Sequence, residues 1–116
     1  MGAEQTPYDR PVRVERRAVD ERESRAANGP DWDRYADEYQ ATHGEYLGDA
    51  GFLWGPEGTR EDELGALGPV TNRDVLEIGC GAGQCSRWVV AHGGRPVAID
   101  VSMRQLQHSR RIDEEQ

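Results

Sequence analysis

The sequence contains no lysine: all 14 of its basic residues are arginine. They form no basic stripe, and acidic residues outnumber them by eight, so binding along a nucleic-acid backbone is disfavoured. The negative excess lies in residues 31–63, which hold ten acidic residues against Arg34 and Arg60. No run of eighteen apolar residues and no apolar signal segment after Met1 occurs, so we expect a cytoplasmic protein without a membrane partner.

Cysteine is scarce as well, and the two that occur, Cys80 and Cys85, are separated by four residues. They form no C-x-x-C pair and no histidine-rich pattern accompanies them, so the sequence predicts no metal site. We expect two small, semi-buried thiols of a reduced protein. The three histidines are interpreted as a loop residue (His43), a helix-end charge (His92) and a surface residue (His108).

Apolar residues are few, at 35% against 31% charged residues, which suits one small domain at most. Residues 1–29 are polar, mix arginine with glutamate and contain Pro7 and Pro11, so we expect a disordered tail there. The helical spacing of apolar residues within residues 30–68 predicts an N-terminal helical cap segment. Residues 69–116 predict the first half of an α/β domain.

The cap segment is expected to open with a helix that begins near Pro30 and ends at Gly44, because proline suits the first helical position. Its aromatic and small residues recur at helical spacing, which places on one face Trp32, Tyr35, Ala36 and Tyr39.

A second, short helix is expected after Thr59, with Asp62 completing a capping box. Its apolar contacts would be Leu64 and Leu67, and Gly68 would end it.

The periodicity changes after residue 73, where short apolar runs replace the helical pattern. Asp74–Ile78 and Pro96–Asp100 each predict a strand covered on both faces. Gln84–His92 predicts a helix between them, and Ser102 is placed to cap a last helix with Leu106 as its apolar contact. The order strand, helix, strand, helix implies a right-handed crossover and a parallel pair, and therefore an α/β fold.

Three glycines, Gly79, Gly81 and Gly83, follow the first strand directly. Side chains there would block the approach of a ligand, and the amides at the start of the next helix would face it. Asp100 ends the second strand 21 residues after Gly79, about the spacing at which an acid reaches a pair of ribose hydroxyls. The pattern therefore predicts an adenosine-type ligand.

The finer pattern departs from the dinucleotide fingerprint, which requires glycine or alanine where this chain has Gln84. Glu77, two residues before the first glycine, would repel a diphosphate and attract an ammonium or a sulfonium. Both departures favour a cationic nucleoside.

These motifs resemble a known family. "EIGCGAG" followed by "AID" looks like the first two signature motifs of the class I S-adenosylmethionine-dependent methyltransferases, whose fold is Rossmann-like. "WDRYADEYQ" is similar to a helix that precedes the domain in the small-molecule branch. The resemblance covers roughly residues 30–112 and implies S-adenosyl-L-methionine as cofactor.

The resemblance also implies a role for each matched residue. Glu77 would lie near the methionine amino group, Asp100 would accept the ribose hydroxyls and Val101 would lie against the adenine. Tyr39, together with Trp32, could close over the methionine end, although packing of an amphipathic helix is the favoured explanation of both. Glu77 could instead merely end its strand, and Val101 could merely pack. The complete cofactor set is Glu77, Gly79, Gly81, Gly83, Asp100, Val101 and Tyr39, and no catalytic residue is implied.

Only the first strands of such a domain are present, so we expect an incomplete, truncated domain that folds weakly by itself. The function predicted is methyl transfer to a small-molecule acceptor, with this chain as the cofactor-binding half. Two alternatives stay open: half of a nicotinamide- or flavin-binding oxidoreductase, and a non-catalytic interaction protein.

Overall fold

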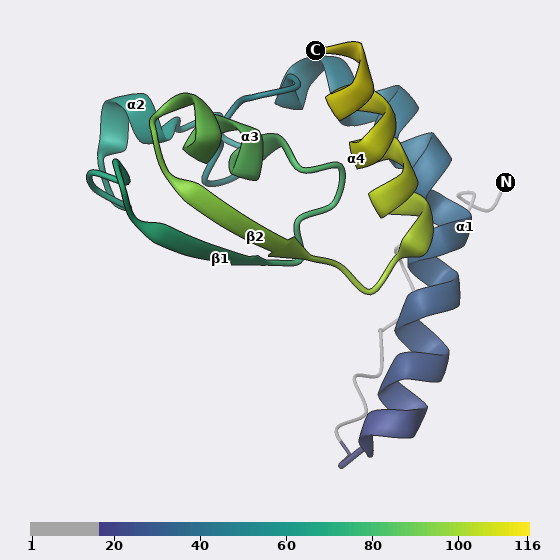
Figure 1. The fold of residues 1–116 in the computed structure, drawn as a ribbon. Helices are drawn as coiled ribbons and strands as arrows, with labels where there is room; N and C mark the ends of the chain where they lie inside the picture. The colour runs from purple at the N-terminus through teal and green to yellow at the C-terminus, as the bar shows by residue number, and fades with distance from the viewer. Residues whose placement is uncertain (1–16) are drawn as a thin grey trace, which may run out of the picture.

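The computed structural model describes residues 17–116, and most of the predicted tail, residues 1–16, lies outside that part of the chain. Figure 1 shows α3 lying over one side of two strands, while α4 lies along α1. The described part is therefore an α/β arrangement around a two-stranded parallel sheet. In chain order the elements are α1 (Glu21–Leu47), α2 (Glu61–Leu64), β1 (Asp74–Ile78), α3 (Gln84–Ala91), β2 (Arg95–Ile99) and α4 (Met103–Glu115).

The β1-α3-β2 unit confirms the predicted order, with each boundary within one residue of its expected place. The two strands run parallel, in a register that sets Asp74 opposite Arg95 and Ile78 opposite Ile99. An ion pair between Asp74 and Arg95, 2.7 Å long, joins the N-terminal ends of the two strands. The other ends lead into the glycine turn and into Asp100, which therefore lie side by side.

The two faces of this sheet differ in their environment. The strand residues that face α3 are half-buried, whereas those on the opposite face are exposed, up to 76% for Ile78. The prediction that both strands are covered on both faces is therefore wrong for the described chain, since only α3 lies over the sheet. The exposed apolar side chains are Leu76, Ile78, Val97 and Ile99.

Helix α1 begins at Glu21, so the prediction of a disordered tail over residues 1–29 is wrong for the last nine of them. Its start is fixed by Asp20, whose carboxylate accepts a hydrogen bond from the backbone N–H of Glu23 at 2.8 Å. Acidic side chains in the first turn also complement the helix dipole. Pro30 therefore lies inside the helix, where it removes one donor without ending it.

The end of α1 also lies beyond the expected residue. Gly44 keeps a helical backbone, and the helix continues to Leu47, after which Gly48 leaves it with a φ of 70°. A positive φ is the conformation that glycine tolerates at a helix end, and it occurs at Gly48 rather than at Gly44.

Helix α2 is a single turn and differs from its prediction at both ends. Arg60 occupies the N-cap position without a side-chain hydrogen bond, so the capping box from Thr59 to Asp62 is not formed. Gly65 ends the helix in the left-handed conformation, three residues before Gly68.

The reason lies in Glu61, which is only 3% exposed. One of its carboxylate oxygens accepts hydrogen bonds from the backbone N–H groups of Leu67 and Gly68, at 2.9 and 3.2 Å. These bonds fold the following segment back over the helix start, and Leu64 and Leu67 are exposed rather than packed.

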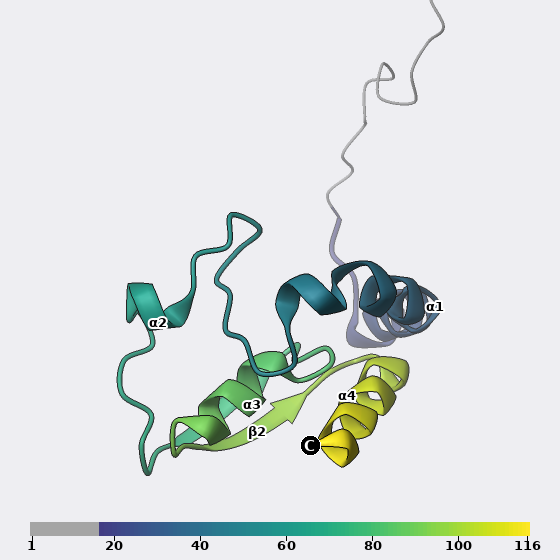
Figure 2. The same ribbon diagram turned by 90° about the horizontal axis from the view of Figure 1, so that it is seen from above.

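The apolar core is small and lies between α3 and the segment that joins α1 to β1. Phe52 meets the ring of Trp88 edge-on, with ring centroids 5.4 Å apart, which anchors that segment beside α3 (Figure 2). The cluster consists of Val70, Trp88 and Val89, with Phe52 and Val75 packed against it.

Candidate functional site

The glycine turn between β1 and α3 has the conformation that its composition requires. Gly79, Gly81 and Gly83 have φ values of 78°, 55° and 86°, which side chains resist. The turn is fixed to the neighbouring strand, because the carbonyl oxygen of Ile99 accepts from the N–H groups of Gly79 and Cys80 at 2.8 and 3.0 Å. A Cβ on Gly79 would meet no atom within 4 Å, so this glycine borders open space.

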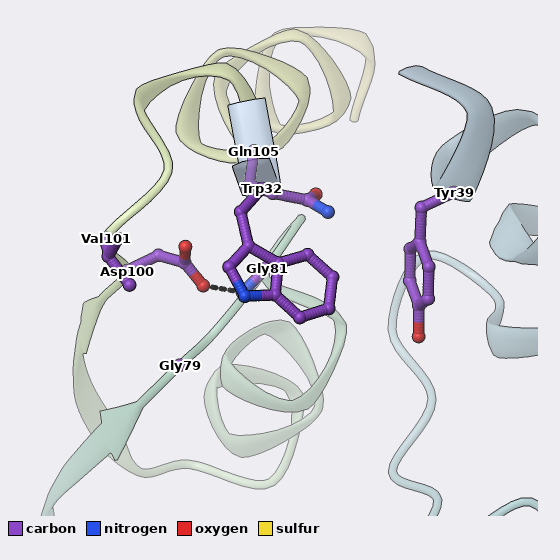
Figure 3. Close-up of a pocket in the computed structure, with 7 residues that line it drawn as sticks. All are labelled: Trp32, Tyr39, Gly79, Gly81, Asp100, Val101 and Gln105. Atoms are coloured by element: carbon purple, nitrogen blue, oxygen red, sulfur yellow. Dashed lines mark hydrogen bonds between the residues drawn. The ribbon is translucent and has the colours of Figure 1, made fainter. Parts of the chain in front are cut away.

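Asp100 ties that turn to the start of α4. One carboxylate oxygen accepts from the N–H of Gly81 at 2.8 Å (Figure 3). The other accepts from the N–H of Ser102, also at 2.8 Å. A carboxylate has about four lone-pair positions, so two remain for a ligand. Asp100 can thus hold the turn and still accept two hydroxyl protons.

A hollow of about 260 Å³ opens beside this turn. In Figure 3 the indole of Trp32 lies in front of Gly81 and the ring of Tyr39 stands apart on the right, and both residues come from α1. The structure therefore brings together five of the seven predicted cofactor residues, together with Trp32. The lining consists of Trp32, Tyr39, Gly79, Gly81, Asp100, Val101 and Gln105.

The other two predicted residues do not line the hollow. Glu77 lies on the α3 side of the sheet, where it accepts a hydrogen bond from the hydroxyl of Ser86 at 3.2 Å, and burial raises the pKa of its carboxyl. Gly83 begins α3, and a Cβ there would come within 2.6 Å of Ser109 Oγ. Gly83 thus serves the packing of α3 against α4.

Gln105 is a lining residue that the sequence interpretation missed. It is 4% exposed, and its side-chain oxygen is buried without a hydrogen-bond partner in the described chain. Ser102-x-x-Gln105 fits a capping box, and Ser102 Oγ indeed accepts from the N–H of Gln105 at 3.1 Å. In a complete capping box the N–H of Ser102 would donate to the side-chain oxygen of Gln105. Here that N–H donates to Asp100 instead, which leaves the Gln105 oxygen without a donor in the described chain. In the sequence, the capping-box pattern Ser102-x-x-Gln105 was the signal that could have identified Gln105 as a buried residue.

A polar cluster holds α1 against α4 and so positions the aromatic side of the hollow. Asp33 accepts from Ser102 Oγ at 2.6 Å and from the N–H of Arg104 at 3.0 Å. Asp37, one turn later, accepts from Arg104 Nε at 2.6 Å and from His108 Nε2 at 2.7 Å. His108 is buried, so its interpretation as a surface residue is wrong. We call these five residues the α1–α4 clasp.

The two cysteines are free and carry no catalytic chemistry in this arrangement. Cys80 is buried and Cys85 half-buried, and burial raises the pKa of each thiol to about 11. Both therefore stay protonated at neutral pH, and a thiol is a poor nucleophile. Within residues 17–116, no cluster of three or more potential ligand side chains could hold a metal ion.

No protein-family model, no curated protein and no solved structure matches this chain. None of the helices in residues 17–116 combines the length and the apolar character needed to cross a bilayer. The function of this chain is therefore inferred from the geometry of the hollow and from the motifs around it.

Proposed function

We propose that this chain binds S-adenosyl-L-methionine and serves as the cofactor half of a methyltransferase that acts on a small molecule. The observation that carries the proposal is the meeting of the bare Gly79 backbone, the Asp100 carboxylate and two aromatic rings in one hollow. When bound, this cofactor would supply a methyl group that its positive sulfur already activates.

The space beside the turn fits such a ligand. A second hollow, of about 560 Å³, shares Gly79, Asp100 and Val101 with the first and continues between Ile78 and Gly29. A nucleoside with its ribose at Asp100 could thus place its base toward Val101 and its amino-acid end toward Trp32 and Tyr39. This division follows the roles that the sequence resemblance implies.

The charges beside the turn favour a cation over a diphosphate. The lining of the first hollow includes the Asp100 carboxylate and no basic side chain. Arg25 borders the second hollow, but its guanidinium pairs with Glu21 at 2.7 Å, which offsets its charge. A diphosphate would therefore meet the Asp100 carboxylate, with Arg25 at the exposed edge of the second hollow as the nearest lining cation, whereas a sulfonium or an ammonium would be attracted.

The residues of this chain would bind and orient the cofactor rather than act as a general acid or base. Asp100 would accept the ribose hydroxyls, and the glycine turn would let the ligand lie against the backbone. Trp32 and Tyr39 would shield the reacting end from water. Methyl transfer depends mainly on alignment of donor and acceptor, so such positioning is the principal contribution expected of this half.

A pair of valine variants tests the proposal. Val101 is 57% exposed and borders both hollows, whereas Val90 is 60% exposed and borders neither. Both positions should accept arginine with little change in stability, within about 0.5 kcal/mol. Val101→Arg should weaken the binding of S-adenosylhomocysteine by about tenfold or more in calorimetric titration, because the long side chain fills the space assigned to the adenine. Equal binding by Val101→Arg and Val90→Arg would refute this assignment.

A further inference from the structure

A third hollow, of about 540 Å³, lies next to the first one and shares Tyr39 with it. Its walls come from the end of α1 and from the segment that follows, and they are largely aromatic. The imidazole of His43 stacks on the Tyr39 ring with centroids 4.4 Å apart, while Tyr46 and Trp54 are about half exposed at the opening. We call this space the aromatic hollow; it falls in the size range of small-molecule sites.

The walls of the aromatic hollow are held by specific bonds rather than by chance contacts. The Tyr46 hydroxyl donates to the carbonyl oxygen of Pro56 at 3.1 Å, which ties the end of α1 to the following loop. The backbone N–H of Trp54 donates to the carbonyl oxygen of Thr59 at 2.9 Å. The rings are thus held in place before any ligand arrives, which lowers the entropic cost of binding.

A buried negative charge lies directly behind Trp54. The indole N–H of Trp54 donates to the Glu61 carboxylate at 2.7 Å, and that residue is 3% exposed. Burial acts to raise the pKa of Glu61, but hydrogen bonds from Trp54 and from backbone N–H groups hold it below its ordinary value. Within residues 17–116, no basic side chain pairs with Glu61.

This arrangement makes the exposed indole face attractive to a cation. A carboxylate that accepts the indole N–H increases the electron density on the ring, whose face already attracts positive charge. The Glu57 carboxylate adds to this effect at the rim, since it lies within 2.7 Å of the position of a Cβ on Gly55, a lining residue. The surrounding segment, residues 31–63, carries the whole excess of eight negative charges.

We propose that the aromatic hollow binds a small organic cation, an amine attached to a flat apolar group. The ammonium would lie over the Trp54 and Tyr46 rings, and the flat group would extend toward Tyr39 and His43. Binding of the amine follows from the hollow itself, whereas its use as the methyl acceptor rests on the proposed function. Tyr39 borders both hollows, so the acceptor atom would have to lie on the flat group, at its Tyr39 end, rather than on the ammonium.

Three matched probes test the charge preference: tyramine, tyrosol and 4-hydroxyphenylacetate, which share one ring and carry an ammonium, a hydroxyl and a carboxylate. Titration of the full 116-residue chain, followed by nuclear magnetic resonance at pH 7 and low salt, should show tyramine binding about three- to tenfold more tightly than tyrosol. 4-Hydroxyphenylacetate should bind most weakly, because Glu61 and Glu57 repel its negative charge. Equal affinities for the three probes would overturn the proposal.

Three variants at two tryptophans locate the site. Trp54→Leu should weaken tyramine binding about three- to tenfold, and Trp54→Phe, which keeps a ring, should have an intermediate effect. Trp32→Leu serves as the matched control, because Trp32 lines the neighbouring hollow only. Circular dichroism of each variant checks that the fold is kept. If Trp32→Leu weakened tyramine binding as much as Trp54→Leu, the placement would be wrong.

The same samples separate this inference from the proposed function. Titration with S-adenosylhomocysteine reports on the hollow at Asp100, and tyramine reports on the aromatic hollow. Tyramine binding without nucleoside binding would contradict the methyltransferase proposal and leave the amine site supported. Nucleoside binding without a preference for tyramine would overturn the amine site alone.

Discussion

Alanine substitutions at Gly79 and Gly83 should separate the binding role of the glycine turn from its structural role. Both glycines have positive φ, at 78° and 86°, so alanine at either position should cost about 1–2 kcal/mol in backbone strain. A Cβ at Gly79 would project into open space, whereas one at Gly83 would lie 2.6 Å from Ser109 Oγ. Relieving that contact requires Ser109 to change its rotamer, which should cost about 1 kcal/mol more.

The expected total is therefore about 1–2 kcal/mol for Gly79→Ala and about 2–3 kcal/mol for Gly83→Ala. Urea unfolding followed by tryptophan fluorescence measures both losses. With a slope of about 1–2 kcal/mol per molar urea, Gly79→Ala should lower the midpoint by about 1 M, and Gly83→Ala by more. Nucleoside binding should respond in the opposite order: it is lost in Gly79→Ala and kept in folded Gly83→Ala.

A double substitution provides the control. Ser109→Ala removes the oxygen that the new Cβ would meet, so combined with Gly83→Ala it should recover the steric part of the loss and leave the strain. The reasoning would be refuted if Gly79→Ala were the less stable variant, or if Ser109→Ala recovered nothing.

Three further predictions follow from the packing and the charges. Hydrogen bonds from Arg104 and His108 lower the pKa of Asp37 in the folded chain. The stability that Asp37 contributes is therefore complete above the pKa of an unperturbed Asp, about 3.9, and is lost as the pH falls through the lower pKa of the folded state. In acid titration the wild type should lose stability more steeply than Asp37→Asn, and equal curves would contradict the α1–α4 clasp. Val89→Ala should cost about 2 kcal/mol in urea unfolding because Val89 is 2% exposed, whereas Ile78→Ala should stay within about 0.5 kcal/mol because Ile78 is 76% exposed; comparable losses would mean that the outer sheet face is covered. With thiol pKa values of about 11, only about one molecule in a thousand carries either thiolate at pH 8, so alkylation by iodoacetamide should be slow there and should accelerate up to pH 11; a rapid reaction at pH 8 would contradict the burial of both cysteines.

The β1-α3-β2 unit could be predicted from the sequence because its signals are local. The short apolar runs, the three glycines and the acid after the second strand each act within a few residues. The same holds for Ser102, whose role as the cap of α4 depends only on its neighbours. Four of the predicted site residues, Gly79, Gly81, Asp100 and Val101, therefore lie together in one hollow through local signals alone.

The remaining features depend on partners that are distant in the sequence. Asp33 accepts hydrogen bonds from Ser102 and Arg104, about 70 positions later in the sequence. His108 is buried because Asp37 accepts its N–H, and Glu61 because the following segment folds back on it. No periodicity reports such contacts, so the clasp and the buried carboxylate were missed.

The outer sheet face shows a different limit. Apolar residues at successive strand positions predicted cover on both sides, because a buried parallel strand has that composition. Within residues 17–116, α3 covers one side only, and Leu76 and Val97 are exposed on the other. The apolar pattern shows that these strands favour burial on both faces, but the described part of the chain provides a covering helix on one face only.

The central claim is that the hollow at Asp100 selects a nucleoside with a cationic end over one with a diphosphate. Parallel calorimetric titrations test it most directly: one with S-adenosylhomocysteine, whose amino-acid end carries an ammonium beside a carboxylate and no net charge, and one with NAD, whose diphosphate is anionic. We expect saturable binding of S-adenosylhomocysteine at 1:1 stoichiometry and affinity for NAD lower by at least about tenfold. Tighter binding of NAD would contradict the account.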